Sequence, residues 1–195
     1  MVYVTHTPLS RALPGLHATA KDLFLILAGS VALALASRIA LYLPLSPVPI
    51  TAQTLMVFAI GALLGSRRGA LSVLAYVVEG AAGLPVFAAG NAGLIYMLGP
   101  TGGYIVGFVA AAFVVGWYAE KYWHRKTVTI LLALIIASVA IYAPGLLWLA
   151  RFVGLQRAVA AGLLPFIPGD TVKLLLAAMV LPQTRHYASR MLPFA

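Results

Sequence analysis

The sequence predicts an all-α membrane protein with six transmembrane helices, which form a single integral membrane domain over residues 1–195. Hydrophobic residues make up 63% of the chain and charged residues only 9%, and the mean hydropathy is +1.01. Soluble domains carry about 25% charged residues, so this composition excludes an ordinary soluble fold. Several apolar runs reach the roughly 20 residues that a helix needs to cross a bilayer. We expect the spanning segments to be helical because backbone polar groups find no water partner in lipid.

Turn-rich loops and basic residues separate the six predicted spans. Neutral loops that contain proline and glycine follow the first span, at 44–50, and the third span, at 83–101; these residues stop helices and set tight turns. Arg67 and Arg68 separate the second span from the third. The stretch 151–167 is apolar but broken by arginines and prolines, and it is predicted to be an outer loop with a short helix. The predicted spans are 22–43, 50–65, 69–82, 102–120, 127–149 and 169–183.

The distribution of basic residues predicts the orientation, with both termini in the cytoplasm and residues 1–21 forming a cytoplasmic segment. That segment lacks the short apolar core and cleavage site of a signal peptide. In this topology the three outer loops, at 44–50, 83–101 and 150–169, carry only two arginines, as the positive-inside rule expects. These neutral loops are predicted to be ordered and to form a lid over a pocket. The basic residues on the inner side are Arg11, Lys21, Arg67, Arg68, Lys121, Arg125, Lys126, Arg185 and Arg190.

Composition also narrows the chemistry. A net charge of +9 suggests nucleic-acid binding, but the basic residues sit at the membrane edge, where anionic lipid headgroups account for them. The absence of cysteine excludes disulfides, thiolate metal ligands and cysteine nucleophiles. The four histidines lie in the termini and an inner loop, without metal-ligand spacing, and no two carboxylates share a site. We therefore predict no metal, no cofactor, no nucleic-acid partner and no enzymatic activity.

Alanines recur every four residues on the first predicted span, at Ala28, Ala32, Ala36 and Ala40. Small residues at this spacing let another helix approach closely, which is how membrane helices associate. The residues alone leave two interpretations open: the stripe packs inside this chain's own bundle, or it docks a partner subunit.

Two charged residues, Asp170 and Lys173, open the sixth predicted span directly after Pro168 and Gly169. Residues three apart share a helix face, and ionisable groups at membrane depth are paired or functional. The two side chains are therefore a mutual ion pair, or Asp170 caps the helix, or both belong to a binding site. Arg38, in the outer half of the first span, is expected to extend outward. Asn91, beside glycines in the second neutral loop, is either a turn residue or a ligand contact.

Five motifs together closely resemble the BioY family, the biotin-capturing S components of energy-coupling factor (ECF) vitamin transporters. The likeness extends over nearly the whole chain after about residue 20. One departure is that the family often has Gly-Gly where this chain has GNAG at 90–93. The motifs are PVPITAQT at 47–54, GALLG at 61–65, GLPVF at 83–87, GPTGGYIVGF at 99–108 and PGDTVK at 168–173.

The resemblance implies a prokaryotic cell-membrane protein with an outward-facing biotin pocket. It also implies a membrane T component and two cytosolic ATPase subunits as partners, with the alanine stripe similar to the motif that contacts the T component. Biotin carries an apolar bicycle and chain, a ureido group and a carboxylate, which suit an apolar cavity with few polar groups. Asp170 is expected to accept from ureido N–H groups, and Lys173 to pair with the carboxylate or to hold Asp170. Gln53, Asn91 and Tyr104 are expected to supply neutral hydrogen bonds.

Two alternatives stay open. An S component for another vitamin such as lipoate would have the same architecture. A membrane-embedded transferase would belong to a different class, and the missing acid–base constellation argues against it.

Overall fold

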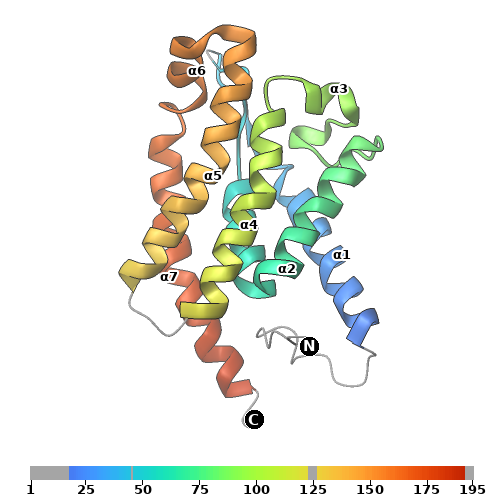
Figure 1. Cartoon of the computed structure of the whole chain (residues 1–195), viewed down its shortest axis with the longest axis vertical. Helices are drawn as coiled ribbons and strands as arrows, with labels where there is room; N and C mark the ends of the chain where they lie inside the picture. Colours follow the sequence, from blue (N-terminus) through green and yellow to red (C-terminus); the bar gives the residue numbers. More distant parts are fainter. Residues whose placement is uncertain (1–17, 45, 123–126, 192–195) are drawn as a thin grey trace.

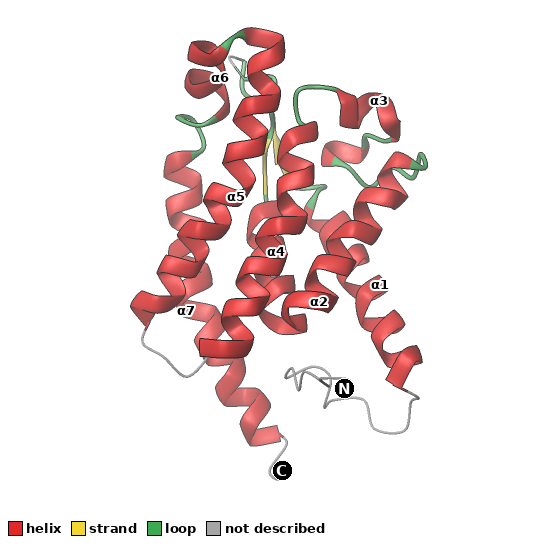
Figure 2. Ribbon diagram, viewed as in Figure 1, coloured by secondary structure: helices red, strands yellow, loops and turns green. Residues whose placement is uncertain are grey.

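The computed structural model describes residues 18–44, 46–122 and 127–191, and it is a helical bundle (Figures 1 and 2). A single two-residue antiparallel pairing, with Ala40 opposite Thr51 and Leu41 opposite Ile50, joins the first two helices. The all-α prediction is confirmed apart from this short pairing. The elements are α1 (Ala18–Ala36), β1 (Ala40–Leu41), β2 (Ile50–Thr51), α2 (Gln53–Ala81), η2 (Ala88–Gly90), α3 (Gly93–Leu98), α4 (Gly102–Tyr122), α5 (Thr127–Val153), α6 (Leu155–Gly162) and α7 (Ile167–Met191).

Helix α2 is a hairpin of two antiparallel arms that fold back at Gly65. A helix rises about 1.5 Å per residue, so Gln53 and Tyr76 would lie about 35 Å apart in a straight helix. Instead Gln53 Nε2 donates to the Tyr76 hydroxyl at 2.5 Å. Gly65 makes the reversal with φ 85° and ψ 177°, a conformation that only glycine adopts readily. In Figure 1 the two arms descend to the turn and rise again toward α3.

Four helices, α1, α2, α4 and α5, are long and apolar enough to cross a membrane, and the bent pair α6–α7, with an angle of 51°, makes a fifth candidate. The sequence prediction counted the arms of α2 as two spans, at 50–65 and 69–82. The structure places the reversal at Gly65, the last residue of the predicted second span, where the backbone leaves helical geometry. Six crossings stay a prediction.

Helix α1 is shorter than the predicted span 22–43, because it ends at Ala36 and the chain continues into β1. Ser37 and Arg38 end the helix by bonding to a distant loop: Ser37 Oγ lies 2.7 Å from the Val86 carbonyl oxygen, and Arg38 Nη2 donates to the Pro85 carbonyl at 2.6 Å. Arg38 is exposed and makes this contact, and its extension toward the outer surface stays a prediction. Ala40 was predicted to continue the alanine stripe; that placement is wrong, since Ala40 lies in β1.

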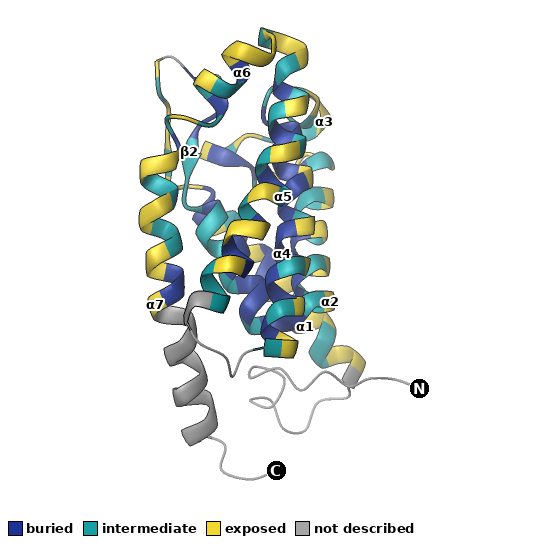
Figure 3. Cartoon of the chain, turned by 60° about the vertical axis from the view of Figure 1, so that its left-hand side comes forward, coloured by how far each residue is buried: buried dark blue, intermediate teal, exposed yellow. Residues whose placement is uncertain are grey.

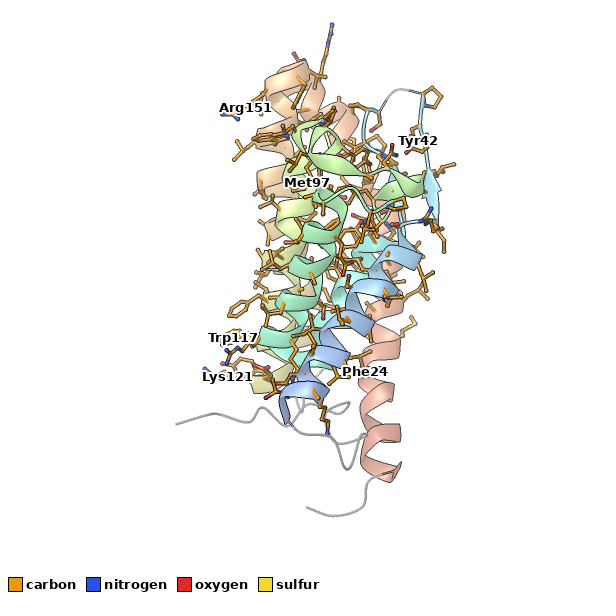
Figure 4. All side chains as sticks on the ribbon, turned by 90° about the vertical axis from the view of Figure 1, so that its right-hand side faces the viewer. Phe24, Tyr42, Met97, Trp117, Lys121 and Arg151 are labelled. Atoms are coloured by element: carbon orange, nitrogen blue, oxygen red, sulfur yellow. The ribbon has the colours of Figure 1, made fainter. Side chains whose placement is uncertain are left out.

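The two ends of the bundle differ. One end, called here the turn end, holds the Gly65 turn, the start of α1 and the end of α4 (Figure 1), with Lys121 and Trp117 labelled there in Figure 4. Arg68 pairs with Asp22 at 2.6 Å, and Glu120 accepts hydrogen bonds at 2.8 Å from the backbone N–H and hydroxyl of Ser66. The opposite end, the loop end, carries the β pairing, η2, α3 and α6, with Arg151, Met97 and Tyr42 labelled.

The inner-side basic residues of the prediction fall at the turn end where the structure describes them. Lys21 opens α1, Arg67 and Arg68 follow the Gly65 turn, and Lys121 ends α4. Arg11, Arg125 and Lys126 lie outside the described residues, and the side chains of Arg185 and Arg190 do as well.

The core lies where α2 and α4 pack together, with α1 and α5 on either side (Figure 3). The backbones of α2 and α4 approach closely. A Cβ atom on Gly116 of α4 would lie 2.4 Å from the Gly65 carbonyl carbon of α2. Outward-facing apolar side chains such as Leu35, Ile136 and Leu147 are 66%, 56% and 70% exposed. An apolar exterior over a tightly packed interior is expected of helices that meet lipid.

Candidate ligand-binding site

A cavity of about 50 Å³ lies in the loop half of the bundle. It is enclosed by helices α4, α5 and α7 and by the residues where β2 meets α2. By this measure it holds a few water molecules. Its wall is mostly apolar and aromatic with a few converging polar groups, the composition typical of small-molecule sites. The lining residues are Val48, Pro49, Thr51, Gln53, Thr54, Ala88, Tyr96, Thr101, Tyr104, Ile105, Phe108, Ile141, Tyr142, Phe166, Asp170 and Lys173.

Asp170 and Lys173 form an ion pair at the cavity wall, with Lys173 Nζ 2.9 Å from Asp170 Oδ1. Their side chains are only 14% and 15% exposed. Both carboxylate oxygens are engaged, because the Tyr142 hydroxyl of α5 donates to Oδ2. Lys173 also donates to Thr54 Oγ1 of α2 at 3.1 Å. The ion-pair interpretation is thus correct, and the pair also faces the cavity, so the two interpretations of the sequence do not exclude each other.

This cluster is stable only because its members satisfy one another. An isolated charge in a low-dielectric site costs several kcal/mol or more. The first turn of α7 adds a favourable dipole for the carboxylate of Asp170. The polar groups therefore form one connected unit at one wall of an otherwise apolar cavity.

Gln53 and Tyr104, which the sequence analysis predicted as site residues, also line the cavity. Gln53 is 4% exposed and its amide nitrogen is bonded to Tyr76. The Tyr104 hydroxyl donates to the Gly162 carbonyl at 2.9 Å, which ties α4 to the end of α6. Tyr104 therefore presents its ring to the cavity while its hydroxyl has a structural partner.

Asn91 does not line the cavity. It is exposed, and its Nδ2 donates to the Ala88 carbonyl at 2.7 Å and to the Tyr42 hydroxyl at 3.3 Å. The structure thus favours the turn interpretation, because a side chain that bonds a backbone carbonyl three residues back stabilises a turn.

Five polar residues that line the cavity were not singled out from the sequence: Tyr142, Thr54, Tyr96, Thr51 and Thr101. Tyr142 lies two residues before Pro144, in an otherwise apolar span, and its polar hydroxyl there was the available signal. Thr54 ends the PVPITAQT motif. Tyr96, in α3, stacks its ring on that of Phe87, with 5.4 Å between the ring centroids, and burial raises the pKa of its hydroxyl.

The loop 83–92 is tied to the bundle. Phe87 is fully buried and meets Tyr76 edge-on at 5.5 Å. The Ala89 N–H donates to the Ser37 carbonyl at 3.1 Å. This loop therefore rests on the end of α1 and on the rising arm of α2, next to the cavity.

Along α1, the burial of the alanine stripe increases from Ala28 to Ala36. Ala28 is exposed, Ala32 is half-buried and Ala36 is 7% exposed. Ala32 and Ala36 border an apolar groove of about 630 Å³ between α1, the descending arm of α2 and α7.

Within the described residues, no three His, Cys, Asp or Glu side chains come together as a metal site.

Comparison with known proteins decides the family. The model of the BioY family matches residues 8–190. The chain belongs to the BioY family. It is 43% identical to the probable biotin transporter BioY of Pyrococcus horikoshii over 70% of this chain and 80% of that protein. It is 41% identical to the biotin transporter BioY of Thermotoga maritima over 71% of this chain and 81% of that protein.

A solved structure agrees with this assignment. A 2.1 Å crystal structure of the S component for biotin from an ECF-type ABC transporter superposes with a TM-score of 0.78 at 25% identity, over 86% of this chain and 92% of that chain. BioY proteins are transporters and not enzymes, which confirms the sequence prediction on that point. The apolar helices and the transporter relatives make this chain a multi-pass integral membrane protein.

Proposed function

We propose that this chain is a substrate-binding S component that captures biotin from outside the cell and delivers it across the membrane with an ECF module. The observation that carries the proposal is the Asp170–Lys173–Tyr142 cluster. It forms the charged wall of an otherwise apolar cavity in a chain of the BioY family.

Biotin suits this wall chemically. The carboxylate of Asp170 accepts hydrogen bonds from the ureido N–H groups, while the bicycle contacts apolar and aromatic side chains such as Phe108 and Ile141. Lys173 pairs with the biotin carboxylate or keeps Asp170 in place. In the first role the biotin carboxylate pairs with the ammonium group of Lys173, and in the second role the existing ion pair stays intact, so neither role leaves Lys173 as an unpaired buried charge.

The cavity must open to admit the vitamin. Ligand sites for small molecules enclose about 300–1,000 Å³, against about 50 Å³ here. The predicted outer loops contribute lining residues to the cavity, Val48 and Pro49 from the first loop and Ala88 and Tyr96 from the second. We propose that they are the lid.

The orientation follows from charge. We propose that the turn end faces the cytoplasm of a prokaryotic cell, which places both termini there and the cavity on the outer side. Each arm of α2 then counts as one crossing, so that α1, the two arms, α4, α5 and the α6–α7 pair make six.

The partners are those of an S component: a T component in the membrane and two cytosolic ATPase subunits. We propose that the exposed part of the alanine stripe, Ala28 and Ala32, with Ala36 at its edge, contacts the T component. Small residues allow a close helix approach, and the adjoining groove provides room for larger side chains of a partner helix.

Equilibrium binding of radiolabelled biotin to the purified chain tests the proposal. We expect one biotin per chain, tight binding, no chemical change in the ligand, and competition by biotin but not by lipoate. Displacement by lipoate and not by biotin would assign another vitamin. Conversion of the ligand without stoichiometric binding would point to a transferase instead.

A further inference from the structure

Phe87, the last residue of the GLPVF motif, is not a cavity residue, yet the structure buries it completely. Its ring lies between two other aromatic rings. It meets the Tyr76 ring edge-on, with 5.5 Å between the centroids. It stacks on the Tyr96 ring, with 5.4 Å between the centroids and 19° between the planes. Because Tyr96 lines the cavity, Phe87 supports the ring of a wall residue from behind.

The position of the Phe87 ring depends on Gly80, on the rising arm of α2. A Cβ atom at residue 80 would lie 2.1 Å from Phe87 Cζ and 2.3 Å from Phe87 Cε1, so the tip of the ring fills the space that a side chain would need. The backbone of Phe87 is held as well. Its N–H donates to the Asn91 carbonyl at 2.9 Å, and Ser37 Oγ lies 3.2 Å from its carbonyl oxygen. The ring therefore cannot move away from residue 80 without straining these contacts.

Helix α3, which carries Tyr96, lies on the surface of the bundle. None of its six residues is buried, and Tyr96 and Met97 are the two that pack against the core. The residue after the helix is held by the Trp148 indole N–H, which donates to the Gly99 carbonyl at 2.9 Å. A short surface helix takes its position from such contacts, so the stack on Phe87 helps to determine where the Tyr96 ring lies at the cavity.

Tyr96 and the charged cluster belong to opposite walls of the cavity. Helix α7 contributes Asp170 and Lys173 to the lining, and α3 contributes Tyr96; the two helices lie on either side of α4 (Figure 1). In the bicycle of biotin, the urea and the sulfur-containing ring form opposite edges. With the urea at Asp170, the sulfur-containing ring is directed toward α3. A thioether sulfur makes favourable contacts with aromatic rings.

We propose that Tyr96 is a specificity-determining residue that contacts the sulfur-containing ring of biotin, and that Phe87, packed against Gly80, is the positioning residue that holds Tyr96 there. Such a site prefers biotin over desthiobiotin, in which the sulfur is absent and the second ring is open. The assignment rests on the proposed biotin site and adds the wall that recognises the second ring.

The readout is the ratio of the dissociation constants of desthiobiotin and biotin, measured by competition with radiolabelled biotin. Tyr96→Leu removes the aromatic ring, and we expect the ratio to fall roughly fivefold, which is the size of a sulfur–aromatic contact. Tyr96→Phe keeps the ring and should keep the ratio. The flexibility of the open analogue costs the same in every protein and cancels, and a general loss of structure weakens both ligands alike.

Gly80→Ala and Phe87→Leu test the positioning role, and each should lower the ratio although Tyr96 is unchanged. In a Phe87→Leu background, Gly80→Ala should lower it no further, because leucine lacks the ring tip that the new Cβ would meet. In a Tyr96→Leu background, Phe87→Leu should also have no further effect on the ratio, because Phe87 acts through Tyr96. Phe113→Leu, on the outward face of α4 and 49% exposed, is the matched control and should leave the ratio unchanged.

The outcomes are distinct. Biotin binding by the wild-type chain with a ratio of one, or with the same ratio in Tyr96→Leu, would overturn the contact with the second ring and leave the proposed function standing. A ratio that falls in Tyr96→Leu but not in Gly80→Ala would overturn the positioning role of Phe87, also where Phe87→Leu does not fold. A further fall when Phe87→Leu is added to Tyr96→Leu would contradict that role as well. Failure of the wild-type chain to bind biotin would overturn both the proposed function and the assignment of Tyr96.

Discussion

Lys173 Nζ lies 2.9 Å from Asp170 Oδ1 across one turn of α7, and the same ammonium group donates to Thr54 of α2. The pair therefore joins α7 to the helix on the other side of the cavity. Helix α7 makes few other contacts with the bundle along this stretch, and its outward residues Leu175 and Met179 are 47% and 60% exposed. A ligand that takes over one member of the ion pair therefore also changes how α7 is held. This connection leads to the first three predictions.

Replacing Asp170 with Asn should weaken biotin binding by about 1.5–3 kcal/mol or more, because a charge-assisted hydrogen bond to the ligand is lost. The affinity is measured by equilibrium binding on folded protein. Thr171→Ala, whose hydroxyl bonds the Ile167 carbonyl on the outer face of α7, is the neighbouring control. An Asp170→Asn protein that binds biotin as tightly as wild type would remove Asp170 from the site.

Lys173→Ala should also weaken binding, and biotin methyl ester identifies the role of the lysine. If Lys173 pairs with the biotin carboxylate, the ester binds the wild-type chain poorly and loses little more in the variant. If free biotin and the ester lose the same factor, Lys173 acts by holding Asp170. Measuring both ligands on both proteins separates these roles.

Tyr142→Phe removes the hydroxyl that donates to Asp170 Oδ2. A hydrogen bond to a charged group contributes roughly 1.5–3 kcal/mol, so the variant should lose both biotin affinity and thermal stability. Asp170→Asn in the same background should then cost less than it does alone, because the two residues share one interaction. Additive losses would mean that the Tyr142 hydroxyl contributes independently of Asp170.

The alanine stripe separates into two kinds of position. Ala28→Leu and Ala32→Leu alter the exposed and half-buried part of α1; we expect these variants to bind biotin but to fail to copurify with the T component and ATPases. Ala36→Leu fills a buried position, where overpacking costs roughly 1–3 kcal/mol, so thermal stability should fall. Loss of biotin binding in Ala28→Leu together with loss of assembly would contradict the docking role.

Gly65→Ala tests the hairpin. With φ 85° and ψ 177°, an alanine there should destabilise the fold by roughly 1–3 kcal/mol, measured as thermal unfolding in detergent. Gly169→Ala, in open space within α7, is the control and should have little effect. An unchanged melting temperature for Gly65→Ala would show that the two arms of α2 do not depend on this turn.

Much of this protein is readable from the sequence because a bilayer restricts what a chain can do. Composition and the length of the apolar runs predict a multi-pass helical bundle. The uncharged loops and the basic residues between spans predict which end carries the pocket. The five motifs predict the BioY family, which the comparisons confirm. Asp170, Lys173, Gln53 and Tyr104, which were predicted to bind biotin, line the cavity, because polar groups in apolar spans are few and each needs a partner; their role in binding stays a prediction.

Other features were decided only by the tertiary structure. The end of α1 at Ala36 depends on hydrogen bonds from Ser37 and Arg38 to a loop about 50 residues later, which no local pattern records. The Asn91 side chain hydrogen-bonds a carbonyl of its own loop. The Tyr142 hydroxyl hydrogen-bonds Asp170, which lies 28 residues later in the chain. Local composition determines which segments enter the membrane; the partner of each buried polar group depends on how those segments pack, since a hydrogen bond in lipid is satisfied by whichever group the fold brings within reach.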